Sequence, residues 1–362
     1  NPSSLYFFLS LFLVYLSFTL SSITQLSWST YLAPDYDDRT RLLTLRELMA
    51  LLGMFCVIAI PAIVELYDTS LTAKVSAIGV FVLISIPLIT LNGLYHVPDT
   101  KSERIISKID NPFVTFKSLF TNSMLNKIVL AAALIAFCMS LNGALYLIWM
   151  DVVMELPEYS SRLMLMYYFV SVLGLAIWRY LSIKTSKHFA AGVSCVYAVI
   201  ILLFGFAGFF VIRDLETDIK LMGVASFIVL YGFSFSGPMP LINAIIADIS
   251  DKLALEHDDD ISGTVFSYLT TITKVGFGLA AVIPYLVLEL LWGFDINLGV
   301  DNTESSKMAV FYIYTFVPIV CYCIASYMLF SHSLGREEHE KIKSVIKIKS
   351  LIKEPSSGIS KI

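Results

Sequence analysis

One lysine lies deep inside a long apolar segment of the sequence. Lys274 follows the start of segment 262–291 by twelve residues, which at about 1.5 Å per residue places it roughly 18 Å from that end of a helix. A cation in the middle of a membrane costs about 2.5 to 3.5 kcal/mol on insertion scales, so we expect it to face water, a carboxylate or a solute. Thr270, one turn earlier, lies on the same face. The two residues predict a polar pathway, and a lysine that only locks two helices together is the alternative.

Charged residues of opposite sign lie at two span ends that are far apart in sequence. Arg39, Arg41 and Arg46 lie between the first two apolar segments, and Asp248 and Asp251 end the seventh. In a carrier that opens alternately to each side, ion pairs between its halves form when one face closes and break when it opens. The pattern predicts such a gate. The alternative is a basic loop and an acidic loop that never meet.

Polar and aromatic residues also interrupt the first and fourth apolar segments. Thr24 and Trp28 lie in the first, and Asn142, Tyr146 and Trp149 in the fourth. Lipid does not favour polar groups, so we expect some of them to face a cavity or another helix. A tryptophan there either stacks on a sugar or an apolar solute or anchors the span at the membrane interface.

The composition excludes most other classes of protein. Of the 362 residues, 57% are hydrophobic and 15% are charged, and the net charge is −4, so we predict a membrane protein and no nucleic-acid partner. The five cysteines lie in apolar segments without metal-ligand spacing. The sequence offers no nucleophile–base pair or phosphate-binding loop, so we expect neither an enzyme nor a cofactor.

The elements that must position these residues are long helices. A bilayer core about 30 Å thick needs about 20 apolar residues of helix, and nine segments meet that requirement. Gly237, Pro238 and Pro240 predict a break or kink in the seventh. We therefore predict an all-α membrane protein with nine spans, near residues 5–32, 46–66, 74–96, 127–150, 163–183, 188–212, 220–247, 262–291 and 308–331.

The loop charges predict orientation and organisation. Most of the 25 Lys and Arg residues fall on one side of the spans, so that side and the C-terminal tail are expected in the cytoplasm. Nine crossings then put Asn1 outside the cell. Removing the first three helices of a twelve-helix carrier would leave nine spans with an exterior N-terminus. We predict an N-terminally truncated chain divided into a half-carrier remnant (1–96), a cytoplasmic linker (97–126), a six-helix half-carrier (127–332) and a cytoplasmic tail (333–362).

Two blocks of sequence resemble the glycoside-pentoside-hexuronide:cation symporters, the melibiose-permease family of the major facilitator superfamily. The first runs from Trp28 to Arg46 (WSTYLAPDYDDRTRLLTLR) and matches the family's DY-x-x-RTR pattern. The second joins an AD-x-x-D segment, Ala247 to Asp251, to a helix that bears Lys274. The blocks lie about 200 residues apart in register, and the resemblance covers nearly the whole chain.

The resemblance implies a twelve-helix major facilitator fold that binds solute between its halves and couples uptake to Na⁺ or H⁺. It assigns Lys274, Thr270 and Trp28 to the cation and sugar region, and Arg41, Asp248 and Asp251 to the cytoplasmic gate. Two positions depart from the family. Its sugar-binding acid falls at Thr24, and a gate arginine falls at Asp260.

These inferences predict a cation-coupled symporter of a sugar or related polar solute, in the plasma (bacterial inner) membrane. The expected partners are a small-molecule solute, a monovalent cation and membrane lipid, and no oligomeric state is predicted. The departure at Thr24 leaves room for a lipid or amphiphile carrier. A membrane sensor or scaffold that does not transport is the third reading.

Overall fold

The computed structural model describes residues 4–33, 36–64, 67, 71–97, 119–257 and 261–331. Over these ranges the chain is helical, with no strand. A π-helical turn, η1, extends α5, and two short 3₁₀ turns, η2 and η3, lie in loops. The helices are α1 Ser4–Leu32, α2 Tyr36–Val64, α3 Leu71–His96, α5 Ser123–Ile148, η1 Trp149–Val153, η2 Pro157–Tyr159, α6 Ser160–Lys184, α7 Lys187–Ile212, α8 Thr217–Phe235, α9 Pro238–His257, α10 Ser262–Trp292, η3 Ile296–Asp301 and α11 Glu304–Phe330.

Nine spans, as predicted, are long and apolar enough to cross a membrane in the described part of the chain. Helices α8 and α9 form one of them, and the break predicted there falls at Ser236 and Gly237, just before Pro238. The second helix begins ten residues earlier than predicted, at Tyr36 rather than position 46. Asp37 and Asp38 lie in its first turn, where carboxylates favour a helix N-terminus. The prediction of an all-α membrane protein is confirmed.

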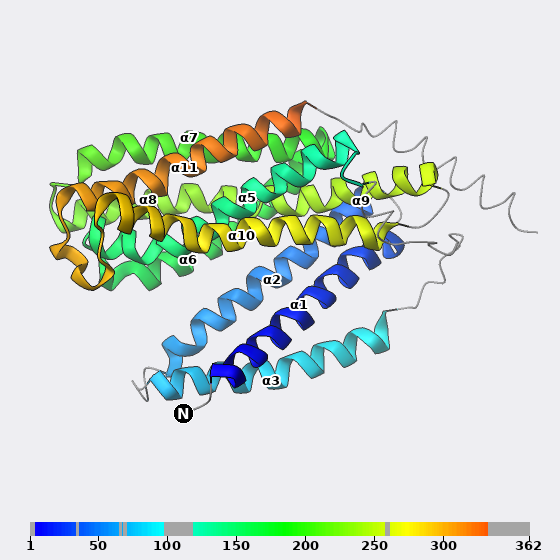
Figure 1. The fold of residues 1–362 in the computed structure, drawn as a ribbon, viewed down its shortest axis with the longest axis horizontal. Helices are drawn as coiled ribbons and strands as arrows, with labels where there is room; N and C mark the ends of the chain where they lie inside the picture. Colours follow the sequence, from blue (N-terminus) through cyan, green and yellow to red (C-terminus); the bar gives the residue numbers. More distant parts are fainter. Residues whose placement is uncertain are drawn as a thin grey trace, which may run out of the picture.

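The helices form two groups (Figure 1). The N-terminal group, residues 4–97, contains α1 to α3, and the C-terminal group, residues 119–331, contains α5 to α11. The groups touch where α2 packs against α6 and α9 and where α1 packs against α10. Figure 1 shows that α1 and α2 approach the C-terminal group at one end and diverge from it at the other. Most of the predicted linker 97–126 and all of the predicted tail 333–362 lie outside the described residues.

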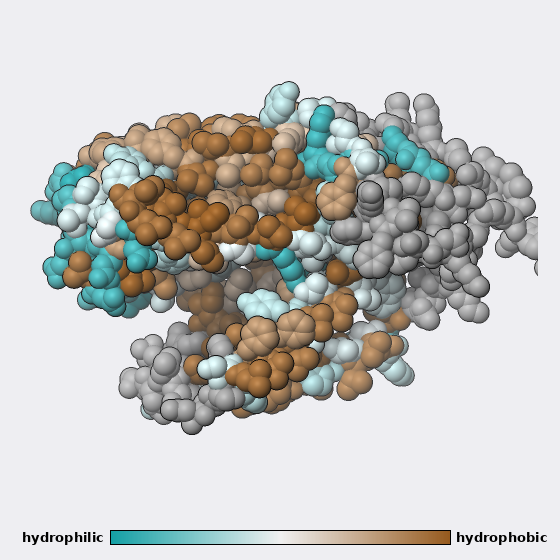
Figure 2. All heavy atoms as spheres, in the orientation of Figure 1, coloured by the Kyte–Doolittle hydropathy of each residue, from teal (hydrophilic) through white to brown (hydrophobic). Residues whose placement is uncertain are grey.

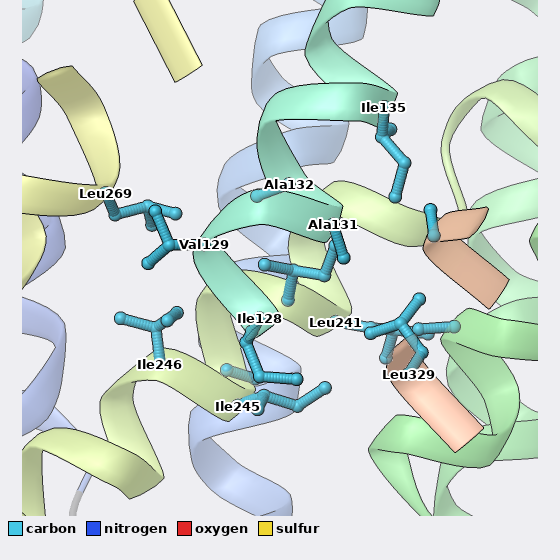
Figure 3. Close-up of a cluster of buried hydrophobic side chains, with 14 of the residues drawn as sticks. Ile128, Val129, Ala131, Ala132, Ile135, Leu241, Ile245, Ile246, Leu269 and Leu329 are labelled. Carbon is cyan, nitrogen blue, oxygen red and sulfur yellow. The ribbon is translucent and has the colours of Figure 1, made fainter. Parts of the chain in front are cut away.

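The packed core lies inside the C-terminal group. Helix α5 packs against α9, α10 and α11, and Figure 3 shows its side chains pointing toward all three. Ile128, Ala131, Ala132 and Ile135 of α5 are fully buried there. Small alanines let the helix backbones approach closely, as is usual where helices pack within a membrane. The C-terminal group is therefore closely packed around α5.

Gly276 lies at a close contact between α10 and α5. A Cβ added at Gly276 of α10 would come within 2.6 Å of the carbonyl oxygen of Ala133 in α5, so the backbone would have to shift. We expect Gly276→Ala to lower the free energy of unfolding by about 1 to 3 kcal/mol, the usual cost of overpacking. Thermal unfolding of the purified protein in detergent measures the change.

Gly278, two residues further along α10, is the matched control. A Cβ at Gly278 meets no atom within 4 Å, and alanine favours a helix over glycine by about 1 kcal/mol. Gly278→Ala should therefore leave the unfolding temperature unchanged or raise it slightly. Equal losses in the two variants would contradict the close approach of α10 to α5.

Candidate functional site

A buried cluster of charged side chains joins the two helix groups. Arg39 of α2 contacts two carboxylates of α9, with 2.9 Å from Nη1 to Asp248 Oδ1 and 2.9 Å from Nη2 to Asp251 Oδ2. Lys187 of α7 also contacts Asp248, with 2.6 Å from Nζ to Oδ2. We call these four residues the ion-pair cluster. Their charges sum to zero, and each is at most 2% exposed.

The local sequence explains how each helix delivers its charge. Asp248 and Asp251 are three residues apart in α9 and so lie on one face. Arg39 lies in the first turns of α2, and its Nε also donates to the carbonyl of Ala33 at 3.3 Å. The guanidinium thus places separate nitrogens on Asp248 and Asp251, a two-pronged geometry that lysine does not offer.

Lys187 is the member of the cluster that sequence reasoning missed. Its charge alone groups it with the basic residues of a loop, but it is the first residue of α7, directly after the N-cap Ser186. A cation is unfavourable at a helix N-terminus, so its complete burial there depends on an anionic partner. The adjacent N-capping serine was a signal that this lysine belongs to a helix.

The structure brings together only part of the predicted gate. Arg39, Asp248 and Asp251 meet, whereas Arg41 is exposed. Arg46 is half-buried, and its Nε is buried without a hydrogen-bond partner among the described residues. Asp260 lies outside the described ranges.

Lys274 lies at the second contact between the two groups. Its ammonium donates a hydrogen bond to the Thr19 hydroxyl of α1, and it lies 5.1 Å from the centre of the Phe18 ring. The Thr19 hydroxyl in turn donates to the carbonyl of Tyr15 at 2.6 Å. Lys274 is only partly buried. It is therefore held by a neutral hydroxyl and an aromatic face, which solvate an ammonium less completely than a carboxylate would.

The predicted neighbours of Lys274 occupy different environments. Thr270 is buried at 7% exposure, and Trp28 of α1 is half-buried. Thr24 is exposed, and its hydroxyl donates to the carbonyl of Leu20 at 2.8 Å. At the position where the resemblance places a sugar-binding acid, this helix thus carries a hydroxyl bonded to its own backbone.

Asn142, Tyr146 and Trp149 lie within the C-terminal group. Asn142 Nδ2 donates to the Tyr231 hydroxyl at 2.5 Å, and the Tyr146 hydroxyl donates to the carbonyl of Ser160 at 2.8 Å. Trp149 stacks on Tyr314, with ring centres 5.0 Å apart. Asn142 Oδ1 and Trp149 Nε1 are buried and have no hydrogen-bond partner in the described part of the protein. Such groups carry a free-energy cost unless a ligand or water satisfies them.

The surface is hollowed between the two groups. Figure 2 shows this hollow alongside an apolar band that separates two more hydrophilic ends. The ion-pair cluster lies at the end where the groups approach each other. At the opposite end, Arg213 and Lys307 pair with Glu304, and Lys307 also approaches Glu155 at 3.8 Å. These ion pairs stay within the C-terminal group and do not bridge to α1, α2 or α3.

A search of the described ranges for three or more His, Cys, Asp or Glu placed to hold a metal ion found none. The groups that the structure does bring together are a partly buried ammonium, hydroxyl groups beside it and a set of ion pairs that two helix groups share, and these suit binding and conformational exchange.

Comparison with known proteins identifies the family. A search of curated proteins found no match to this chain. The family described as MFS/sugar transport protein matches residues 1–336, which is nearly the whole chain. The nine apolar spans found in the described ranges and the two groups that share an ion-pair cluster agree with a multi-pass carrier. The chain therefore belongs to the MFS/sugar transport protein family, the sugar transporters of the major facilitator superfamily.

Proposed function

We propose that this chain carries a sugar or a related polar solute together with Na⁺ or H⁺ across the plasma membrane by alternating access. One observation carries the proposal: the ion-pair cluster ties α2 to α9 at one end of the molecule, while the two groups diverge at the other end. A carrier with one gate shut and the other open has this arrangement.

Opening the shut end requires Arg39 to leave Asp248 and Asp251. Lys187 and Asp248 both belong to the C-terminal group, so their 2.6 Å contact survives when the N-terminal group swings away. Asp248 then stays neutralised, and the exposed Asp251 gains water as the end opens. Retaining one pair lowers the cost of separating buried charges, which suits a gate that must open repeatedly.

The proposed solute pathway follows the contact between α1 and α10. Lys274 is its central residue, and Thr270, Trp28 and Thr24 supply hydroxyl groups and an aromatic face along the same two helices. The ammonium suits a hydroxyl-rich solute because it donates up to three hydrogen bonds. Asn142, with its unpartnered Oδ1, remains a prediction for the pathway, as do Tyr146 and Trp149.

The proposed orientation rests on the basic loops, because cationic loops favour the cytoplasmic side of a membrane. In this orientation the ion-pair cluster is the cytoplasmic gate, and the extracellular end is the open one. Solute would enter from outside and reach Lys274.

Uptake into proteoliposomes tests the proposal. Purified protein is reconstituted, and entry of a panel of radiolabelled mono- and disaccharides is followed under an inward Na⁺ gradient, an inward H⁺ gradient or no gradient. We expect one class of sugar to accumulate with one of the two gradients and to equilibrate without accumulation when neither is present. Uptake of labelled lysophosphatidylcholine without uptake of any sugar would contradict the proposed solute.

A further inference from the structure

The C-terminal group contains an apolar pocket away from the contact between α1 and α10, with Trp149 in its lining. Its volume is about 190 Å³, and it lies between α7, α8, α11 and η1. Several aromatic side chains line it, among them Trp149, Phe209, Phe227, Phe311 and Tyr314. Apolar cavities of about 150 Å³ already admit a molecule the size of benzene, so this pocket accommodates a segment of a hydrocarbon chain.

Three glycines lie in the lining of the pocket, and one of them faces open space. Gly205 and Gly208 of α7 and Gly223 of α8 all line the pocket. An added Cβ at Gly205 would come within 2.5 Å of the Phe227 ring, whereas one at Gly208 would meet no atom within 4 Å. The absence of a side chain at Gly208 therefore keeps the pocket open.

The pocket opens toward the membrane rather than toward the other helix group. Phe204 of α7 and Leu230 of α8 both line it, and they are 71% and 45% exposed. Both belong to membrane-spanning segments, so the medium at the mouth is lipid hydrocarbon. Trp149 and Met154, also in the lining, are 4% and 2% exposed. The pocket thus leads from the lipid phase to buried residues.

We propose that this pocket binds one acyl chain of a membrane phospholipid, inserted between α7 and α8. Lipid chains are the only apolar molecules present at high concentration at the mouth, and a chain fills an aromatic, glycine-lined space with dispersion contacts that an empty space lacks. Occupation would join α7, α8 and α11 through a shared ligand. The site is separate from Lys274 and from the ion-pair cluster, and its test does not depend on transport.

Photolabelling from within the bilayer tests the site. The full chain is reconstituted in phosphatidylcholine vesicles that contain a phosphatidylcholine with a diazirine in one acyl chain, and labelled residues are mapped by mass spectrometry after irradiation. We expect adducts on Phe204, which lipid reaches anyway, and also on Trp149 or Met154, which lipid reaches only through the pocket. Label confined to Phe204 and other exposed residues would overturn the proposal.

Variants that fill the pocket sharpen the result. In Gly208→Leu, label on Trp149 and Met154 should fall by about tenfold because a chain would have to overpack the pocket, while label on Phe204 stays unchanged. Gly208→Ala, a smaller change that serves if the leucine variant does not fold, should give a partial loss. Gly79→Leu in α3, also in open space, is the matched control and should match the wild type. Undiminished label on Trp149 and Met154 in well-folded Gly208 variants would overturn the site.

Discussion

Arg39→Ala is expected to abolish solute uptake and to lower stability. The substitution removes the cation that contacts both Asp248 and Asp251, and Lys187 still contacts Asp248. Removing one partner from a buried ion pair costs about 3 to 5 kcal/mol. The cost applies only to the conformation in which this end is closed, so its population falls by about a hundredfold or more relative to the open conformation. A carrier that no longer closes one gate cannot complete its cycle.

Three measurements distinguish a gate from an ordinary structural contact. Uptake into proteoliposomes should fall to the level of empty vesicles, the unfolding temperature should drop, and hydrogen exchange should increase in the first turns of α2 and near Asp248. Arg41→Ala is the matched control because Arg41 is exposed two residues away, and exposed substitutions usually change stability by less than about 0.5 kcal/mol. Arg39→Lys should restore part of the stability, since lysine keeps the positive charge but lacks the planar guanidinium that contacts two carboxylates at once. Full uptake by Arg39→Ala would refute the gating role.

The parts of this arrangement that depend on span counting were predictable. Composition alone identifies a hydrophobic segment long enough to cross a bilayer. The basic residues at its ends predict on which side of the membrane each loop lies. The same reasoning predicts that Arg39, Asp248 and Asp251 lie at one end of the molecule. It did not select Arg39 over Arg41, because which of two arginines points inward depends on the rotation of α2. That rotation is set by packing against α6 and α9.

Lys187 and the apolar pocket could not be predicted from the sequence, because both depend on tertiary contacts. Lys187 follows a loop serine and looks like one more positive charge on the cytoplasmic side, and only its tertiary contact with Asp248 explains its burial. The pocket is lined by Gly205, Gly208 and Gly223, which lie on two helices. A glycine in a membrane helix predicts close packing as readily as empty space. At Gly276 the structure shows close packing and at Gly208 open space, and the sequence does not distinguish the two.

Lys274→Met is expected to remove transport while leaving the fold intact. Among the described residues the ammonium contacts only the Thr19 hydroxyl and the face of Phe18, so its loss leaves no buried carboxylate of those residues unpaired. Hydrogen bonds to charged groups contribute about 1.5 to 3 kcal/mol. If the solute or the coupling ion depends on this group, uptake should fall by at least about tenfold, while the unfolding temperature stays within a few degrees of the wild type.

Thr19→Val distinguishes this role from a simple lock between α1 and α10. It removes the acceptor of the Lys274 hydrogen bond but keeps the ammonium, so a pathway role predicts that uptake is largely retained. A lock predicts the reverse pattern, in which Thr19→Val and Lys274→Met lower the unfolding temperature and uptake together. Thr271→Val, on α10 but exposed and bonded to the carbonyl of Ser267, controls for loss of a hydroxyl from a membrane helix. Transport at the wild-type rate by Lys274→Met would remove the residue from the pathway, and the solute would then have to be sought elsewhere along the hollow between the two groups.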